Sequence, residues 1–219
     1  MTAPIRGVVP PLAIPHKDGK LDTVSLKRHI NRMIDAGIHA LFVLGSSGEV
    51  VFSTSQRRGE ILEATQSIVE GRIPVIAGVI DTETDRVIEH IRQAESFGVD
   101  AVVATAPFYA LQGEAEIYRH FRTLREATDL PLWAYDIPVC VHTKLSNRLL
   151  MDLGTQGVLS GVKDSSGDDV AFRWLARANE EAGHPLQLLT GHEVVVDGAY
   201  MSGADRKSTR LNSSHTNRS

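Results

Sequence analysis

The chain has 219 residues, of which 42% are hydrophobic and 23% charged, a composition that fits one or at most two globular domains and excludes disordered, fibrous and membrane-spanning proteins. Its 23 basic and 27 acidic residues give a net charge of −4, so we expect a small-molecule partner and no nucleic acid. Cys140 is the only cysteine and cannot form an internal disulfide, and residues 1–6 lack the apolar core of a signal peptide. We therefore expect a cytoplasmic protein with no membrane attachment.

Seven short apolar segments recur along the chain, and their starts are 27 to 34 residues apart. A βαβ unit has a similar repeat of about 30 residues. Amphipathic helix patterns lie between the segments, for example at residues 26–34 and 87–97, and Gly98 is a predicted helix C-terminal cap. The alternation predicts a parallel sheet covered by helices. The predicted strands are residues 7–13, 40–44, 74–78, 101–104, 131–135, 159–163 and 187–190.

Two architectures contain such a sheet. A doubly wound dinucleotide-binding sheet would have a Gly-x-Gly-x-x-Gly turn after its first strand, but Val-Val-Pro-Pro-Leu follows Gly7. A (β/α)8 TIM barrel instead has polar and reactive residues at the carboxyl ends of its strands, where the active site forms. This chain has such residues there, so we predict an α/β fold of the barrel type. The strand-end segments begin at Gly45, Thr105, Tyr135, Lys163 and Thr190.

The predicted barrel is incomplete, because at the observed spacing an eighth strand would begin just after Ala204. Residues 205–219 have no apolar periodicity and carry one acid against four bases. Residues 205–215 are also what a common sequencing-library adapter would encode. We therefore expect residues 1–204 to form a truncated catalytic domain that is inactive by itself, and residues 205–219 to be a non-native tail without helix or strand.

Lys163 is one of six lysines and ends an apolar run at residues 158–162. At the carboxyl end of a barrel strand it should be partly buried. Burial disfavours the ammonium form, which makes the amine a nucleophile toward carbonyl carbon. The alternative is a structural lysine paired with Asp164 or Asp168.

Three further segments suggest a site for a 2-oxo acid. Ser46 and Ser47 lie between glycines, where hydroxyls and backbone N–H groups bind an anion or simply form a turn. Tyr135 ends a strand and is either a proton carrier or a core tyrosine. Tyr109 lies in a loop and, taken alone, is more typical of an interface. An anion site, an amine and a phenol together predict carbon–carbon chemistry on a 2-oxo acid.

Three motifs carry a resemblance to a known family. Residues 45–49, Gly-Ser-Ser-Gly-Glu, resemble the signature of the dihydrodipicolinate synthase and N-acetylneuraminate lyase family. Residues 135–138, Tyr-Asp-Ile-Pro, resemble its tyrosine motif, and residues 161–168 resemble its Schiff-base lysine motif. The resemblance covers residues 5–204. It implies a class I aldolase or hydro-lyase that needs no metal or cofactor, on a (β/α)8 barrel that is usually a homotetramer.

The resemblance also assigns roles to individual residues. Lys163 would form an imine with pyruvate or another 2-oxo acid, and Tyr135 would move protons to and from the intermediates. Ser47 would relay protons to Tyr109 of a neighbouring subunit. Ser46 and Ser47, with their backbone N–H groups, would bind the substrate carboxylate.

The predicted pocket departs from the family where the second substrate binds. Ile137 and Gly191 are implied to shape the pocket. The lysine-pathway synthase has an arginine two residues after the motif proline, which binds the carboxylate of the aldehyde, whereas this chain has the neutral Cys140. With Asp136, where many members have asparagine, this favours an apolar or sugar-like aldehyde. His142 is a candidate to bind its hydroxyl group.

Other functions remain open at this point. The chain could be a 4-hydroxy-tetrahydrodipicolinate synthase proper, or a non-catalytic member that binds a 2-oxo acid. A structural assembly protein would need neither Lys163 nor the serines. The nine histidines form no His-x-x-x-His pair, so we predict no metal site.

Overall fold

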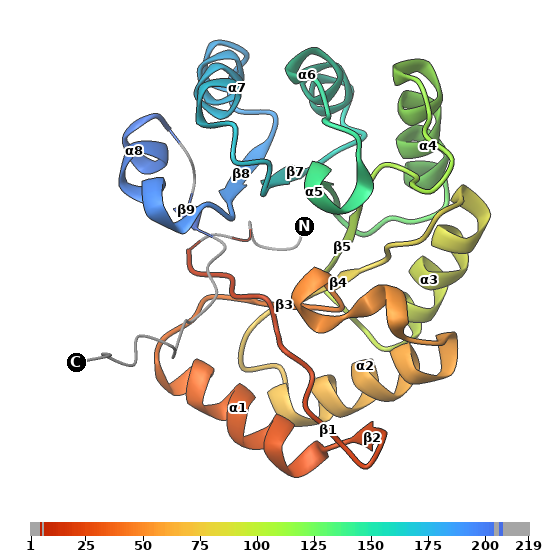
Figure 1. The fold of residues 1–219 in the computed structure, drawn as a ribbon. Coiled ribbons are helices and arrows are strands. Elements are labelled where there is room, and N and C mark those ends of the chain that lie inside the picture. Colours follow the sequence, from red (N-terminus) through yellow and green to blue (C-terminus); the bar gives the residue numbers. More distant parts are fainter. Residues whose placement is uncertain (1–4, 6, 204–205, 208–219) are drawn as a thin grey trace.

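The computed structural model describes residue 5, residues 7–203 and residues 206–207. A parallel sheet curls around a hydrophobic interior, and the helices follow one another around its outside from α1 to α8 (Figure 1). Each strand lies next to its neighbour in the chain, which is the order of a (β/α)8 barrel. The strands of this sheet are β3 (Leu41–Val43), β4 (Val75–Gly78), β5 (Ala101–Ala104), β6 (Leu132–Asp136), β7 (Gly161–Asp164), β8 (Gln187–Thr190) and β9 (Arg206–Lys207).

Several of the helices begin at side-chain caps that satisfy backbone N–H groups of the first turn. Asp22, Thr54, Ser146 and Asp168 cap α1, α2, α6 and α7 in this way. Gly98 follows α3 with a φ of 69°, as predicted for its cap. The remaining elements are α1 (Thr23–Asp35), η1 (Ser46–Gly48), η2 (Val50–Phe52), α2 (Ser55–Val69), α3 (Thr84–Ser96), α4 (Glu114–Glu126), α5 (Pro138–Val141), α6 (Asn147–Thr155), α7 (Asp169–Glu181), η3 (Glu193–Val195), α8 (Val196–Met201) and the hairpin β1 (His16–Lys17) and β2 (Lys20–Leu21).

The first predicted strand, residues 7–13, lies beside β3 but is not a regular strand. The Phe42 N–H donates to the Pro10 carbonyl at 3.0 Å, and the Leu12 N–H donates to the Phe42 carbonyl at 2.8 Å. Proline has no N–H to donate, so Pro10 and Pro11 interrupt the ladder and leave an isolated bridge between Pro11 and Phe42. The predicted place of the segment is confirmed, and its predicted conformation is wrong.

β9 corrects the expectation that residues 205–219 form no strand. Leu189 pairs with Arg206 and Thr190 with Lys207 in parallel register. An edge strand such as β8 offers unpaired backbone groups to any sequence that runs beside it, so side-chain periodicity does not reveal such pairing. The rest of the predicted tail lies outside the described residues. Among the described residues β9 is not paired with residues 7–13, so the sheet is an incomplete (β/α)8 barrel, as predicted.

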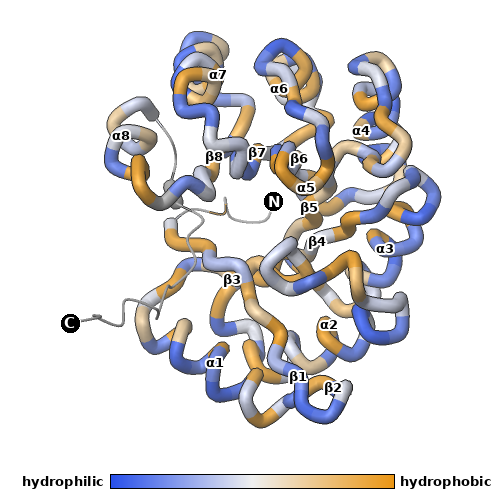
Figure 2. Tube along the Cα trace, in the orientation of Figure 1, coloured by the Kyte–Doolittle hydropathy of each residue, from blue (hydrophilic) through white to orange (hydrophobic). Residues whose placement is uncertain are grey.

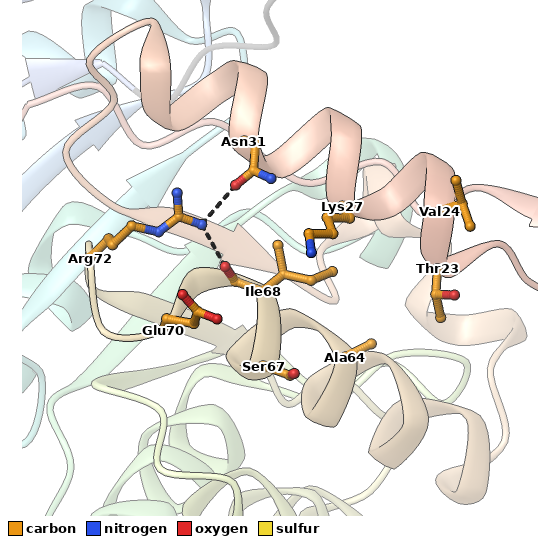
Figure 3. Close-up of a pocket in the computed structure, with 9 residues that line it drawn as sticks. All are labelled: Thr23, Val24, Lys27, Asn31, Ala64, Ser67, Ile68, Glu70 and Arg72. Carbon is orange, nitrogen blue, oxygen red and sulfur yellow. Dashed lines mark hydrogen bonds between the residues drawn. The ribbon is translucent and has the colours of Figure 1, made fainter.

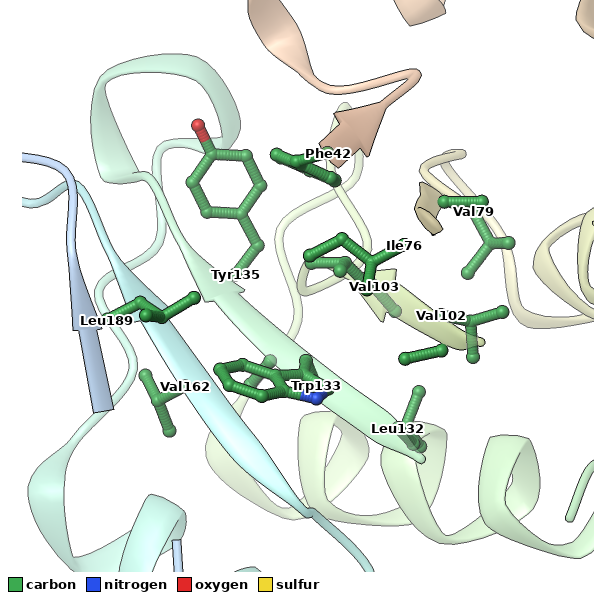
Figure 4. Packing of buried hydrophobic residues seen from close by; sticks show 14 of the residues in the cluster. Phe42, Ile76, Val79, Val102, Val103, Leu132, Trp133, Tyr135, Val162 and Leu189 are labelled. Atoms are coloured by element: carbon green, nitrogen blue, oxygen red, sulfur yellow. The ribbon is translucent and has the colours of Figure 1, made fainter. Parts of the chain in front are cut away.

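The strands sort their side chains between the interior and the helices. Trp133 and Tyr135 lie on one face of β6 with Phe42 nearby, whereas Leu132 lies on the opposite face (Figure 4). Hydrophobic residues follow the strands, and hydrophilic residues are prominent on the outer turns of the helices (Figure 2). Gly161 pairs with Trp133, and a Cβ atom on Gly161 would lie 2.6 Å from a ring carbon of Trp133. The glycine therefore makes room for the indole on the interior face. In the described part of the chain, no helix is long and apolar enough to cross a membrane.

Candidate active site

Lys163 and Tyr135 face each other across β7 and β6 at the carboxyl end of the sheet. The two residues are paired in register, and the Lys163 Nζ lies 3.7 Å from the centre of the Tyr135 ring. Phe42 contributes a second aromatic face at 5.4 Å. Only 4% of Lys163 and 3% of Tyr135 is exposed. The amine donates a hydrogen bond to the Ser165 hydroxyl at 3.1 Å, so it lies buried among aromatic and hydroxyl groups.

Asp164 and Asp168, the carboxylates that a structural Lys163 was expected to pair with, also contact other groups. A carboxylate oxygen of Asp164 lies 3.7 Å from the amine of Lys144. Asp168 caps α7 by accepting from the Ala171 N–H at 2.9 Å.

Ser46 and Ser47 lie in η1, directly after β3. The Ser46 hydroxyl and the Tyr135 phenol are hydrogen-bonded at 3.1 Å, which joins the predicted anion-binding turn to the predicted proton carrier. Burial alone would raise the pKa of Tyr135, but the charge of Lys163 and hydrogen bonds with Lys163, Ser46 and Ser165 hold it below its usual value. A phenol with a lowered pKa is better suited to give up a proton near neutral pH.

The residues predicted to surround the substrate occupy two strand ends. Ile137 is buried at the start of α5, whereas Cys140 and His142 are exposed on and just after that helix. Gly191 follows β8, and a Cβ atom there would lie 2.2 Å from the Ser165 Oγ. Glycine at this position therefore allows the end of β8 to lie close to Ser165, whose hydroxyl accepts the hydrogen bond from Lys163.

Tyr109 lies apart from the other predicted residues in a single chain. Its side chain is 95% exposed, and its backbone has a φ of 78°, which is uncommon for a residue with a side chain. Tyr109 therefore projects from the surface of the chain, a position compatible with a role in a neighbouring subunit.

Phe42, Ser165 and Lys144 were not predicted from the sequence. Ser165 lies two residues after Lys163, just beyond the end of β7, and the alternation of side chains continued past the strand would have placed it beside Lys163. Phe42 reaches the site through the position of β3 in the sheet, and Lys144 through the path of the loop after α5. Neither feature leaves a pattern in the local sequence. Asp136 corrects our interpretation of the second-substrate pocket, because it is fully buried and contacts Lys144 on the face of β6 opposite Tyr135.

Other hollows lie on the outside of the barrel. A groove of about 630 Å³ between α1 and α2 is lined by residues of these helices and the following turn, and none of the strand-end residues lines it (Figure 3). Arg72 crosses its floor, donating to the Asn31 side chain at 2.7 Å and to the Ile68 carbonyl at 2.5 Å. Among the described residues, no group of three His, Cys, Asp or Glu side chains is placed to hold a metal ion.

Comparison with known proteins gives consistent matches. The profile of the dihydrodipicolinate synthetase family matches residues 4–215. A 4-hydroxy-tetrahydrodipicolinate synthase of Phenylobacterium zucineum is 30% identical over 90% of this chain and 66% of its own length. An uncharacterized DapA-like lyase of Halobacterium salinarum is 37% identical over 86% of this chain and 61% of its own. The chain thus spans less than two thirds of the length of these curated relatives.

A solved structure supports the same assignment. It is a prophage protein of the dihydrodipicolinic acid synthase family from E. coli K12, in complex with pyruvate. It superposes with a TM-score of 0.90 and 27% identity, over 94% of this chain and 70% of its own. With the paired lysine and tyrosine, the three motifs and the family profile in agreement, the chain belongs to the dihydrodipicolinate synthetase family.

Proposed function

We propose that the protein is a Schiff-base-forming lyase or aldolase that acts on pyruvate or another 2-oxo acid with an aldehyde or sugar-acid partner. The observation that carries the proposal is the buried amine of Lys163, 3.7 Å from the ring of Tyr135 at the carboxyl end of the sheet. This is the end where (β/α)8 barrels have their active sites. The pyruvate complex of the E. coli relative supports a 2-oxo acid as the ligand.

The reaction begins when the neutral amine attacks the ketone carbon and forms a carbinolamine. Loss of water gives a protonated imine, which accepts electrons when a proton leaves the adjacent carbon, and the resulting enamine attacks the aldehyde carbon. Tyr135 supplies the proton for the departing water and takes protons at the later steps, helped by its lowered pKa. Ser46 and Ser47 bind the carboxylate beside it.

The second substrate contacts the loop that follows β6. Cys140 is exposed on α5 and His142 just beyond it, so this side of the pocket offers no guanidinium to a carboxylate. We therefore propose an apolar or sugar-like aldehyde. The relative from Phenylobacterium favours a second candidate, 4-hydroxy-tetrahydrodipicolinate synthase activity. A direct comparison of aspartate semialdehyde with sugar-derived aldehydes, in the presence of pyruvate, distinguishes the two.

The proton relay extends into a homotetramer in this proposal. Tyr109 is 95% exposed, and the exposed apolar side chains Phe52, Val51 and Leu111 also follow the ends of β3 and β5. Such residues on one end of the barrel are typical of an interface. Within the assembly Tyr109 of a neighbouring subunit would meet Ser47. Light scattering of the purified protein tests the assembly.

Reductive trapping tests the central step. The 219-residue chain, and a version extended to the length of its relatives, are incubated with pyruvate and cyanoborohydride, and peptides are examined by mass spectrometry. The reduced adduct is expected on Lys163 in at least one of the two proteins. Lys163→Ala should abolish the adduct, whereas Lys27→Met, at an exposed lysine of α1, should not. Trapping on another lysine, or in neither protein, refutes the proposal.

A further inference from the structure

Two buried carboxylates lie directly behind the reacting pair. Asp136 and Asp164 follow Tyr135 and Lys163 in the chain, and they are paired in register one step farther along β6 and β7. Because side chains alternate along a strand, they lie on the face of the sheet opposite the amine and the phenol. Asp136 is 0% exposed and Asp164 is 5% exposed. Two like charges directly opposite each other in a buried site repel, and an arrangement of this kind needs a counter-charge.

Lys144 supplies that counter-charge from the loop between α5 and α6. Its amine contacts an oxygen of Asp136 and lies 3.7 Å from an oxygen of Asp164. Lys163 carries a second cationic group close by in the chain, one residue before Asp164 and on the opposite face of β7. Burial raises the pKa of Asp136, as does the neighbouring Asp164, while Lys144 and the Leu145 N–H oppose this rise. The ammonium thus joins the ends of two strands through their carboxylates.

The same contacts hold both loops of the predicted pocket. Asp136 also accepts from the Leu145 N–H at 3.1 Å, and the Lys144 amine donates to the Leu145 carbonyl at 3.3 Å, which fixes the chain that follows α5. On the other side, Asp164 accepts from the N–H and hydroxyl of Ser166, both at 2.8 Å. The intervening Ser165 donates its N–H to the Asp136 carbonyl at 2.8 Å.

Ser165 connects this cluster to the amine, because its hydroxyl accepts the hydrogen bond from Lys163 at 3.1 Å. We propose that Lys144 is a positioning residue, which joins Asp136 to Asp164 and thereby holds Lys163, Tyr135 and the loop after α5 in reacting geometry. It touches no reacting atom and acts through the two carboxylates. The contacts by which Lys144 joins Asp136 to Asp164, called the clamp below, are a property of the fold. Their effect on catalysis rests on the proposed function.

Removal of the ammonium produces a pH-dependent defect with a definite sign. In Lys144→Met the two carboxylates remain opposite each other, and their mutual repulsion raises the pKa at which the pair binds its first proton. Below that pKa one carboxylate is neutral, which removes the repulsion. Above it both groups are ionised and repel, so the strand ends separate. A misplacement of about 1 Å slows a positioned reaction by roughly 100-fold.

The parent is whichever of the 219-residue chain and the extended version forms the pyruvate adduct. The experiment measures its rate of pyruvate trapping on Lys163, and that of its variants, from about pH 6 to about pH 9. The rate of Lys144→Met divided by that of the parent is expected to fall with rising pH, by about 10- to 100-fold at the alkaline end. Dividing by the parent cancels the pH effects that the two proteins share. Lys144→Arg keeps the charge, and the Lys144→Met, Asp136→Asn double variant removes the repulsion, so both ratios should be nearly independent of pH. Lys27→Met is the matched control.

A ratio for Lys144→Met that does not change with pH overturns the proposal, because a lost packing contact alone would give that result. Amide hydrogen exchange without pyruvate provides a second measurement that does not depend on activity. The Ser165 and Leu145 N–H groups should exchange faster in Lys144→Met and regain protection in the double variant. If neither the 219-residue chain nor the extended version forms an adduct, the proposed function fails. Unchanged exchange at these two N–H groups separately overturns the positioning role of Lys144.

Discussion

Replacing Gly161 with alanine is expected to destabilise the interior of the barrel beneath the active site. A Cβ atom at this position would lie 2.6 and 2.7 Å from two ring carbons of Trp133 and 2.8 Å from the Gln187 carbonyl oxygen, whereas ordinary contact begins at 3.4 Å. The indole is rigid and 1% exposed, and the carbonyl belongs to the neighbouring strand, so neither can move freely. Overpacking of this kind costs about 1–3 kcal/mol of unfolding free energy.

Gly59 offers the same substitution with the opposite expectation. It lies inside α2, where alanine is favoured over glycine by about 1 kcal/mol. A Cβ atom there would lie 3.1 Å from the Gln93 Nε2, the end of a flexible side chain that can shift. Gly59→Ala should therefore leave the unfolding free energy unchanged or raise it.

Urea unfolding followed by tryptophan fluorescence measures both variants. We expect Gly161→Ala to lose about 1–3 kcal/mol relative to the parent and Gly59→Ala to match or exceed the parent. Gly161 lies two residues before Lys163 on the same face, so its variant should also trap pyruvate more slowly. If Gly161→Ala unfolds at the urea concentration of the parent, or is more stable than Gly59→Ala, the packing argument is wrong.

Three further predictions follow from the site and the core. Tyr135→Phe should slow imine formation by roughly 100- to 10,000-fold, whereas Tyr118→Phe, on the outer helix α4, should not change it. The rate of reductive trapping with pyruvate measures both variants. Equal rates for Tyr135→Phe and the parent exclude proton transfer by Tyr135. Cys140→Arg should improve the use of aspartate semialdehyde over a neutral aldehyde by roughly 10- to 150-fold, and an unchanged kcat/KM ratio contradicts the proposed pocket. Burial lowers the pKa of His120 to about 4. Between about pH 6.5 and about pH 4, His120 is therefore protonated in the unfolded chain but neutral in the folded chain, so the folded state loses stability as the pH falls through this interval. The protonation of His120 in the unfolded chain should lower the unfolding free energy by about 3 kcal/mol over that interval. His120→Gln, which can keep a hydrogen bond to Thr84, should reduce the pH dependence of the unfolding free energy measured in urea. A variant with the same pH dependence as the parent refutes this role of His120.

The sequence by itself predicted the fold class and the placement of Lys163 and Tyr135 at the carboxyl end of the sheet. Apolar segments at a spacing of 27 to 34 residues were sufficient for a parallel sheet wrapped by helices, because burial on both faces makes such strands continuously apolar. Lys163 and Tyr135 were identifiable because each ends an apolar run, and the carboxyl ends of parallel strands meet at one end of a barrel. The six later predicted strands overlap β3 to β8.

Tertiary structure decided what depends on backbone pairing and on side chains distant in sequence. Two consecutive prolines left residues 7–13 with a single bridge to β3. Residues 206–207 pair with the edge of β8, although the sequence around them has no apolar periodicity. The contact between Lys144 and the two carboxylates could not be predicted, because the register of β6 against β7 and the path of the loop after α5 bring these charges together. Local sequence determines which face of a strand a residue lies on, whereas the identity of its neighbours across the sheet is a property of the folded chain.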